Sequence, residues 1–169
     1  MKSKEREGER EGCVKSTNYH YFLNYNYNFI ISEEVIQYMK GRILNLHVSY
    51  LPWNRGSSPN FWSFIDNTPK GVTIHYIDKG LDTGDILFQQ EIMFDETKET
   101  FASSYERLNT AITNLFKENW EAIRGGKVRP IAQVGDGSYH TMKDFQHFMN
   151  GRTMDWTMNI HEFKKLFGR

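Results

Sequence analysis

Runs of apolar residues divide the chain into short blocks of strand character and one long block of helical character. Strands are predicted at 43–47, 72–77 and 86–92. The first of these, Ile-Leu-Asn-Leu-His, lacks the alternation of a half-exposed strand, which indicates burial on both faces, as in a parallel sheet covered by helices. The segment 16–31 is predicted to be a further strand, or a strand and a loop, ending in an apolar triplet.

The spacing of apolar residues predicts one long helix at about 97–123. Its stripe recurs at steps of three and four and consists of Phe101, Tyr105, Leu108, Ile112, Phe116, Trp120 and Ile123. A stripe of this kind is expected to face the core and not a cofactor. Asp95 or Thr97 is expected to cap its start, and Gly125-Gly126 to end it.

Shorter helices are expected on either side of the predicted strands. Ser32 is a suitable N-cap for a helix through about Met39, and one helical turn is expected at 60–65. A last short helix is expected at 159–167, after a polar connector at 135–145. Strands and helices that alternate in this way predict an α/β protein with a mixed, mainly parallel sheet.

Composition limits the class of protein. The 169 residues suffice for one domain with a core, and 21 basic residues balance 21 acidic ones, so charge favours neither nucleic acid nor a membrane as partner. The single cysteine, Cys13, excludes an internal disulfide and fits a reducing compartment. Because no apolar run approaches the ~20 residues that span a bilayer, we expect a cytoplasmic protein. The charged, polar segment 1–17 is expected to be disordered.

Two short segments carry candidate chemistry. Asn45 and His47 lie two apart on a predicted strand and therefore on the same face, at an edge where open α/β sheets bind ligands. Asp82 lies in a turn whose flanking Gly80 and Gly84 permit tight geometry. An amide donor, an imidazole of pKa near ~6.5 and a carboxylate form a set suited to acyl transfer. Simpler roles, a hydrogen-bonded loop histidine and an Asx turn, stay open for His47 and Asp82.

These segments also resemble a known family. "NLHVSYLPWNRGSSPNFW" and "GVTIHYIDKGLDTGDILFQQ" are similar to the catalytic half of the 10-formyltetrahydrofolate-dependent formyltransferases, which act on glycinamide ribonucleotide, methionyl-tRNA or nucleotide-linked amino sugars. The shared pattern is Asn-x-His, Ser-x-Leu-Pro, Arg-Gly, a Gly-x-Thr strand with a histidine, and Leu-Asp-x-Gly, and the similarity covers about 22–120. The resemblance implies a three-layer Rossmann-like fold, with the family's N-terminal strands expected to be missing here.

The resemblance also implies roles for particular residues. It assigns catalysis to Asn45, His47 and Asp82, and no metal. It implies 10-formyltetrahydrofolate as formyl donor, held by the segment Asn28, Phe29 and Ile30 and by the loop Asp78, Lys79 and Gly80. By their chemistry, four further side chains are candidates for substrate contacts: Trp53, Arg55, His75 and Tyr139. In this scheme Asn45 and protonated His47 stabilise an oxyanion, and Asp82 holds His47 in the useful tautomer.

The expected organisation is a catalytic domain at 18–126 followed by a C-terminal extension with a short helix at 127–169. The segments "YLPWNRG" and "GDGSYHTMKDF" look most like the sugar N-formyltransferases, so the expected acceptor is the amine of a nucleotide-linked amino sugar, and a homodimer is a further expectation. The alternatives are a truncated, inactive or folate-binding-only chain, a methionyl-tRNA or glycinamide ribonucleotide type, and a formyltetrahydrofolate hydrolase. A metal hydrolase using His47, His75, Asp82 and Asp85 is a more distant one.

Overall fold

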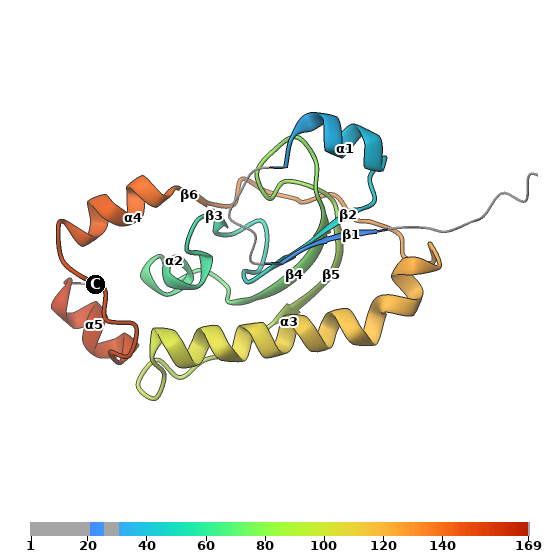
Figure 1. Cartoon of the computed structure of the whole chain (residues 1–169). Helices are drawn as coiled ribbons and strands as arrows, with labels where there is room; N and C mark the ends of the chain where they lie inside the picture. Colours follow the sequence, from blue (N-terminus) through green and yellow to red (C-terminus); the bar gives the residue numbers. More distant parts are fainter. Residues whose placement is uncertain (1–20, 26–30, 169) are drawn as a thin grey trace, which may run out of the picture.

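A computed structural model describes residues 21–25 and 31–168 of the chain (Figure 1). Its main sheet has the strand order β1-β2-β4-β5, where β1 is Phe22–Asn24, β2 is Ile43–His47, β4 is Gly71–Tyr76 and β5 is Ile86–Glu91. The β1–β2 pairing is parallel, whereas the β2–β4 and β4–β5 pairings are antiparallel. The predicted α/β class with a mixed sheet is thus confirmed. The expectation of disorder at 1–17 falls outside the described residues.

Strand β2 lies inside the sheet between β1 and β4, and all five of its residues are buried. This burial explains the absence of alternation in its sequence, because neither face reaches solvent. The predicted bounds of β2 are confirmed, and those of β4 and β5 differ from the prediction by one residue at their ends.

Helix α3 (Phe101–Arg124) covers one face of the sheet, below it in Figure 1. Its Leu108, Ile112 and Ile123 pack against apolar side chains of β2, β4 and β5 in one core cluster. The predicted helix is confirmed, but the predicted cap is wrong: Thr100 is the N-cap, in a reciprocal capping box with Ser103. Asp95 instead accepts hydrogen bonds from Thr97 in the preceding turn, which uses that carboxylate before the helix begins.

Two short helices lie away from this face of the sheet. Helix α1 (Glu33–Met39) lies above the sheet in Figure 1, on the side opposite α3, which gives the three layers. It ends at Met39, as predicted, and its C-cap Lys40 has the left-handed conformation. Helix α2 (Pro59–Ile65), the predicted helical turn, is almost wholly buried.

The C-terminal part adds a second, aromatic core cluster beside the sheet. Helices α4 (Met142–Met149) and α5 (Ile160–Leu166) pack with α2 and with the start of α3 through Phe61, Phe64, Phe101, Met149, Ile160 and Phe163. Helix α5 is confirmed. The prediction of a polar connector at 135–145 is wrong beyond Thr141, where a capping box with Asp144 starts α4.

A second sheet of two strands links this C-terminal part to the loop after β2. Strand β3 (Arg55–Gly56) pairs in parallel with β6 (Tyr139–His140), and neither strand is predicted from the sequence. Gly56 has a φ of 88°, and a Cβ atom there would lie 2.3 Å from the carbonyl oxygen of His140, so this close pairing requires glycine. Among the described residues, no helix is long and apolar enough to cross a membrane.

Candidate active site

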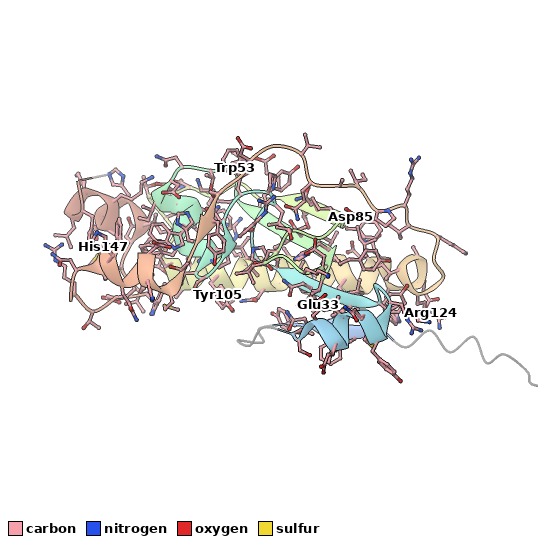
Figure 2. The ribbon with its side chains drawn as sticks, turned by 90° about the horizontal axis from the view of Figure 1, so that it is seen from above. Glu33, Trp53, Asp85, Tyr105, Arg124 and His147 are labelled. Atoms are coloured by element: carbon pink, nitrogen blue, oxygen red, sulfur yellow. The ribbon has the colours of Figure 1, made fainter. Side chains whose placement is uncertain are left out.

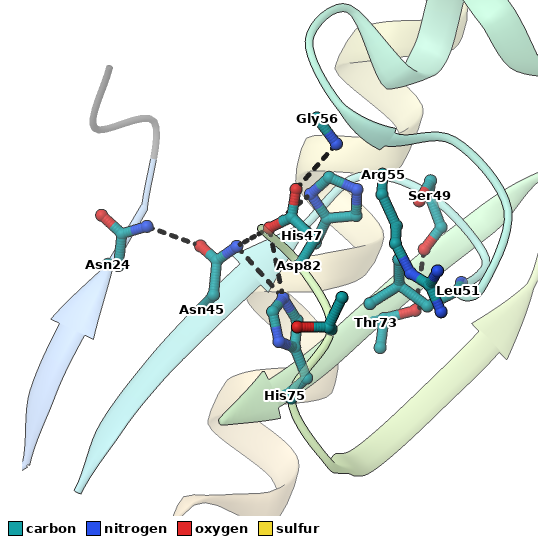
Figure 3. Close-up of polar contacts among 12 residues, drawn as sticks. Asn24, Asn45, His47, Ser49, Leu51, Arg55, Gly56, Thr73, His75 and Asp82 are labelled. Atoms are coloured by element: carbon teal, nitrogen blue, oxygen red, sulfur yellow. Dashed lines mark hydrogen bonds and ion pairs between the residues drawn. The ribbon is translucent and has the colours of Figure 1, made fainter. Parts of the chain in front are cut away.

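Three polar side chains form a row across the main sheet. The register pairs Asn24 of β1 with Asn45 of β2, and Asn45 in turn with His75 of β4. Side chains in register on neighbouring strands lie on one face and within hydrogen-bonding distance of one another. Asp82, from the loop after β4, meets this row from outside the sheet (Figure 3).

The amide of Asn45 is the centre of the row. Its Oδ1 accepts a hydrogen bond from Asn24 Nδ2 at 2.8 Å, and its Nδ2 donates to Asp82 Oδ1 at 3.0 Å. The same Nδ2 lies 3.1 Å from His75 Nε2. His75 Nδ1 faces the carbonyl of Tyr76 at 2.7 Å and must therefore carry a proton, which leaves Nε2 of the neutral ring as an acceptor. These partners fix the orientation of the Asn45 amide, because a flipped amide would place its oxygen against the carboxylate.

Asp82 is held by partners from two different segments. Its Oδ1 accepts from Asn45, and its Oδ2 accepts from the backbone N–H of Gly56 at 2.9 Å. Its backbone φ is 55°, in the left-handed region that Asp tolerates better than most residues. The side chain is 10% exposed and lies 3.8 Å from His47 Nδ1 and 3.6 Å from His75 Nε2. The structure thus brings together the three residues predicted as catalytic.

The tautomer of His47 is fixed by a backbone group. Its Nε2 lies 3.1 Å from the carbonyl oxygen of Asn54, which can only accept, so Nε2 carries the proton. In the neutral ring Nδ1 is therefore the basic nitrogen, and it faces Asp82. The sequence predicts that Asp82 holds the tautomer, but in the structure the Asn54 carbonyl does so, and Asp82 is placed to stabilise a proton on Nδ1.

Burial and the charges around it perturb the pKa of both groups. Burial lowers the pKa of His47 below its usual value, and the charge of Asp82 opposes this only in part, so the ring is neutral near pH 7. Burial opposes ionisation of Asp82, but the positive charge that His47 carries when protonated and the hydrogen bond from the Gly56 N–H hold the pKa of the Asp82 carboxyl well below its usual range. A neutral imidazole beside a carboxylate is a pair that can take up one proton.

These side chains line one large cavity of about 1310 Å³. At one end its wall includes Ile36 of α1 and the loop 78–81; at the other end it includes Ser57, Met142 and Trp156. In Figure 1, α1 lies above the sheet and α4 lies at the left of the molecule, well apart from α1. A single ligand site typically measures ~300–1000 Å³, so this cavity has room for two substrates side by side.

The other predicted site residues are placed differently. Asp78, Lys79, Gly80 and His75 line the cavity, whereas Asn28, Phe29 and Ile30 lie outside the described residues. Lys79 forms an ion pair with Glu33 of α1, which joins the loop to that helix.

Three predicted substrate-binding residues do not belong to the lining of this cavity: Trp53, Arg55 and Tyr139. Figure 2 shows Trp53 on the side of the molecule opposite Tyr105, which does line the cavity. The guanidinium of Arg55 is bound within the protein, to Gln133 Oε1 at 2.8 Å and to the carbonyl of Asp136 at 3.3 Å.

Two residues of the site were not predicted. Asn24 orients Asn45, and its own Oδ1 is buried without a hydrogen-bond partner. Its position two residues after Phe22 in an expected strand gave no sign of this role, because the register of that strand with β2 is a tertiary property. Trp156 lies between α4 and α5, is 44% exposed and stacks on Phe145. In the described part of the chain, no group of three or more His, Cys, Asp and Glu side chains could hold a metal ion.

Fold and site together define an α/β protein with a buried amide–imidazole–carboxylate cluster at one wall of a large cavity. The model of the family described as "Formyl transferase" matches residues 1–119. The chain therefore belongs to the formyl transferase family, which confirms the resemblance seen in the sequence.

The similar proteins differ in the acceptor that their names state. The formyltransferase PseJ from Anoxybacillus kamchatkensis, solved with UDP-4,6-dideoxy-4-formamido-L-AltNAc and tetrahydrofolate, is 42% identical, with a TM-score of 0.80 over 93% of this chain and 82% of that one. A methionyl-tRNA formyltransferase of Lachnospira eligens is 33% identical over 81% of this chain and 42% of its own length. A dTDP-4-amino-4,6-dideoxyglucose formyltransferase of Mycobacterium bovis is 37% identical over 62% and 44%. The chain thus spans less than half the length of these curated relatives.

Proposed function

We propose that this protein transfers a formyl group from 10-formyltetrahydrofolate to the primary amine of a nucleotide-linked amino sugar. The observation that carries the proposal is the convergence of Asn45, His47 and Asp82 on the wall of one cavity with room for a donor and an acceptor. The 42% identity to PseJ, a structure that holds a formamido sugar nucleotide and tetrahydrofolate, supports this choice of substrates.

Formyl transfer involves three changes in the substrates. A bond forms between the amine nitrogen and the formyl carbon, the bond from that carbon to the donor nitrogen breaks, and one proton passes from the amine to the donor nitrogen. His47 receives this proton at Nδ1, and Asp82, 3.8 Å away, stabilises the charged ring until the proton is passed on. Asn45 supplies an N–H to the formyl oxygen when that oxygen replaces Asp82 or His75 as the acceptor of one of its two N–H bonds. A donor of this kind is typically worth about 3 kcal/mol.

The two ends of the cavity differ in the chemistry of their walls. Near α1, the apolar Ile36 and Ile77 and the polar loop 78–81 suit a flat heterocycle with polar edges, so we place the folate there. Near α4, the exposed indole of Trp156 and the hydroxyl of Ser57 suit a nucleotide, whose base can stack on the ring. We still predict that the acceptor contacts Trp53, Arg55 and Tyr139. A homodimer also stays a prediction.

The test is an assay of formyl transfer by the purified chain with 10-formyltetrahydrofolate and UDP- or dTDP-linked 4-amino sugars, read by mass spectrometry of the nucleotide sugar. Gain of one formyl group by the sugar is expected. Folate turnover without any acceptor would indicate a hydrolase instead. Binding of a folate analogue in calorimetry, with no turnover on any acceptor, would indicate a chain that binds folate only.

A second candidate is formylation of methionyl-tRNA. The 33% identity to the Lachnospira eligens enzyme over 81% of this chain favours it. Equal numbers of acidic and basic residues in the sequence argue against it, because RNA binding usually relies on an excess of positive charge. Charged methionyl-tRNA belongs in the same assay as a parallel acceptor, and its formylation in preference to the sugar would replace the first proposal.

A further inference from the structure

A segment that lies beyond the span of the family model contacts the groups that hold His47 and Asp82 in place. Residues 131–140, here called the strap, run from α3 toward α4, whereas the family model matches only residues 1–119. The strap begins with a pair of backbone hydrogen bonds between Ile131 and Ile86 of β5. It ends in β6, which pairs with β3. Between these two anchors the strap lies along two loops, one that carries Asn54, the hydrogen-bond partner of His47, and one that carries Asp82.

Gln133 of the strap bridges the two loops of the site. Its Nε2 donates to the backbone carbonyl of Asp82 at 2.8 Å and to that of Gly84 at 2.9 Å. Its Oε1 accepts from Arg55 Nε at 3.1 Å and Nη2 at 2.8 Å. The amide therefore ties the backbone of Asp82 to β3, whose Gly56 N–H binds the Asp82 carboxylate. A left-handed Asp costs free energy, so its geometry persists only when neighbours hold it.

Ser138 of the strap holds the partner of His47. Its Oγ accepts from the backbone N–H of Asn54 at 2.8 Å and donates to Asn54 Oδ1 at 3.2 Å. Asn54 is fully buried, with a φ of 58°, and its carbonyl oxygen is the acceptor for His47 Nε2. The strap thus reaches His47 through one intervening residue and Asp82 through one hydrogen bond.

We infer that the strap positions the catalytic pair: Gln133 fixes the backbone of Asp82, and Ser138, through Asn54, fixes the ring of His47. Both are positioning residues, since they lie outside the lining of the cavity. Groups that must meet a reacting atom lose rate steeply when misplaced, by ~100-fold for about 1 Å. Transfer at full rate accordingly needs the chain through residue 140. The inference rests on the proposed function for its kinetic test only.

The first test substitutes Gln133. Gln133→Leu removes all four hydrogen bonds of the bridge, and kcat is expected to fall ~10- to 100-fold with the KM of the formyl donor little changed. Gln133→Glu keeps the contact with Arg55 but cannot donate to the two carbonyls, so an equal loss is expected. Val134→Ala, at a neighbouring position that is 83% exposed, is the matched control.

The second test reads His47 directly and needs no activity. In nitrogen-15 NMR of the ring, the wild-type protein is expected to show the Nε2–H tautomer, as the Asn54 carbonyl requires. Ser138→Ala is expected to give a mixture of tautomers and, where transfer is measured, an acid limb of the pH–rate profile moved to lower pH, because a loosened Asn54 carbonyl stabilises the protonated ring less. Ser138→Thr keeps the hydroxyl and is expected to restore the wild-type signals.

A structural role alone makes a different prediction. It lowers the melting temperature of the variants while kcat per folded molecule and the His47 signals stay as in the wild type, and that result overturns the inference. If Gln133→Leu does not fold, Gln133→Glu decides, because it keeps the volume of the side chain and its anchor on Arg55. If the variants show the expected changes in the His47 NMR signals but the wild-type protein transfers formyl to no acceptor, the proposed function is rejected and the positioning role is retained.

Discussion

The proposed catalytic cluster and the aromatic cluster are both largely buried, yet they are held by different forces. Asn45, His47 and Asp82 are held by directional hydrogen bonds from separate parts of the chain. Phe61 and Phe163, with the rings around them, are held by the burial of apolar surface and by edge-to-face or stacked ring contacts. The centroids in these contacts are 4.4–6.5 Å apart. The change of one polar atom in the first cluster should therefore lower the rate of transfer strongly, whereas a loss in the second should cost stability in proportion to the volume removed.

The largest effect is expected from Asp82→Asn. Removal of the negative charge leaves protonated His47 without its stabilising partner, so kcat should fall roughly 10³-fold, or about 4 kcal/mol in barrier, while folding is retained. Formyl transfer under saturating substrates measures this. Asp85→Asn makes the same change at an exposed site in the same loop and should keep the wild-type rate. A loss below about threefold for Asp82→Asn would remove this residue from the mechanism.

The aromatic cluster should give the reverse result. Phe163→Ala deletes a ring that is 2% exposed and contacts Phe61, Phe101, Phe148 and Phe167, so the free energy of unfolding should fall by about 3 kcal/mol. Urea unfolding followed by circular dichroism measures it. The kcat per folded molecule should stay unchanged, and Phe163→Leu should cost much less. A large fall in kcat without loss of stability would show that the two clusters are coupled.

A third prediction compares the contributions of two tryptophans to binding of the acceptor. Trp156 lines the cavity and Trp53 does not, although the sequence favours Trp53 as the substrate contact. Trp156→Ala should raise the KM of the acceptor about tenfold, equal to about 1.4 kcal/mol, with the KM of the formyl donor as internal control. If Trp53→Ala raises the acceptor KM and Trp156→Ala does not, the acceptor binds outside this cavity, near Trp53.

The smallest effect is a pH dependence of stability. The pKa of His47 is lowered by burial, so below about pH 6.5 the unfolded chain binds a proton that the folded chain does not. The contribution of His47 to stability is thus complete above about pH 6.5 and is lost as the pH falls toward the folded pKa. Melting temperatures from pH 8 to pH 5 should fall less in His47→Gln than in the wild type. His161→Gln, at an exposed histidine of α5, is the control, and equal slopes in all three proteins would contradict the effect.

The sequence alone determined most of the local elements and predicted the residues of the proposed catalytic site. The unalternated run of β2 and the stripe of α3 gave their bounds closely, because burial on both faces and a 3.6-residue period leave direct traces in the order of residues. The spacing of Asn45 and His47 placed them on one face, the Gly-flanked turn made Asp82 the candidate carboxylate, and the family pattern supported all three. Helix α4 carried the signal of its capping box, Thr141 and Asp144, inside a segment otherwise rich in turn residues.

Only the tertiary structure decided which partners each of these side chains contacts. Asn24 reaches Asn45 because β1 pairs with β2 in one register, and Gln133 reaches Asp82 because the strap lies beside a loop 51 residues earlier. Arg55 has the same charge wherever it lies, but only the fold shows that its guanidinium binds Gln133 within the protein. Local sequence encodes periods and caps, whereas partners distant in the chain are fixed only when the whole fold minimises unpaired buried polar groups.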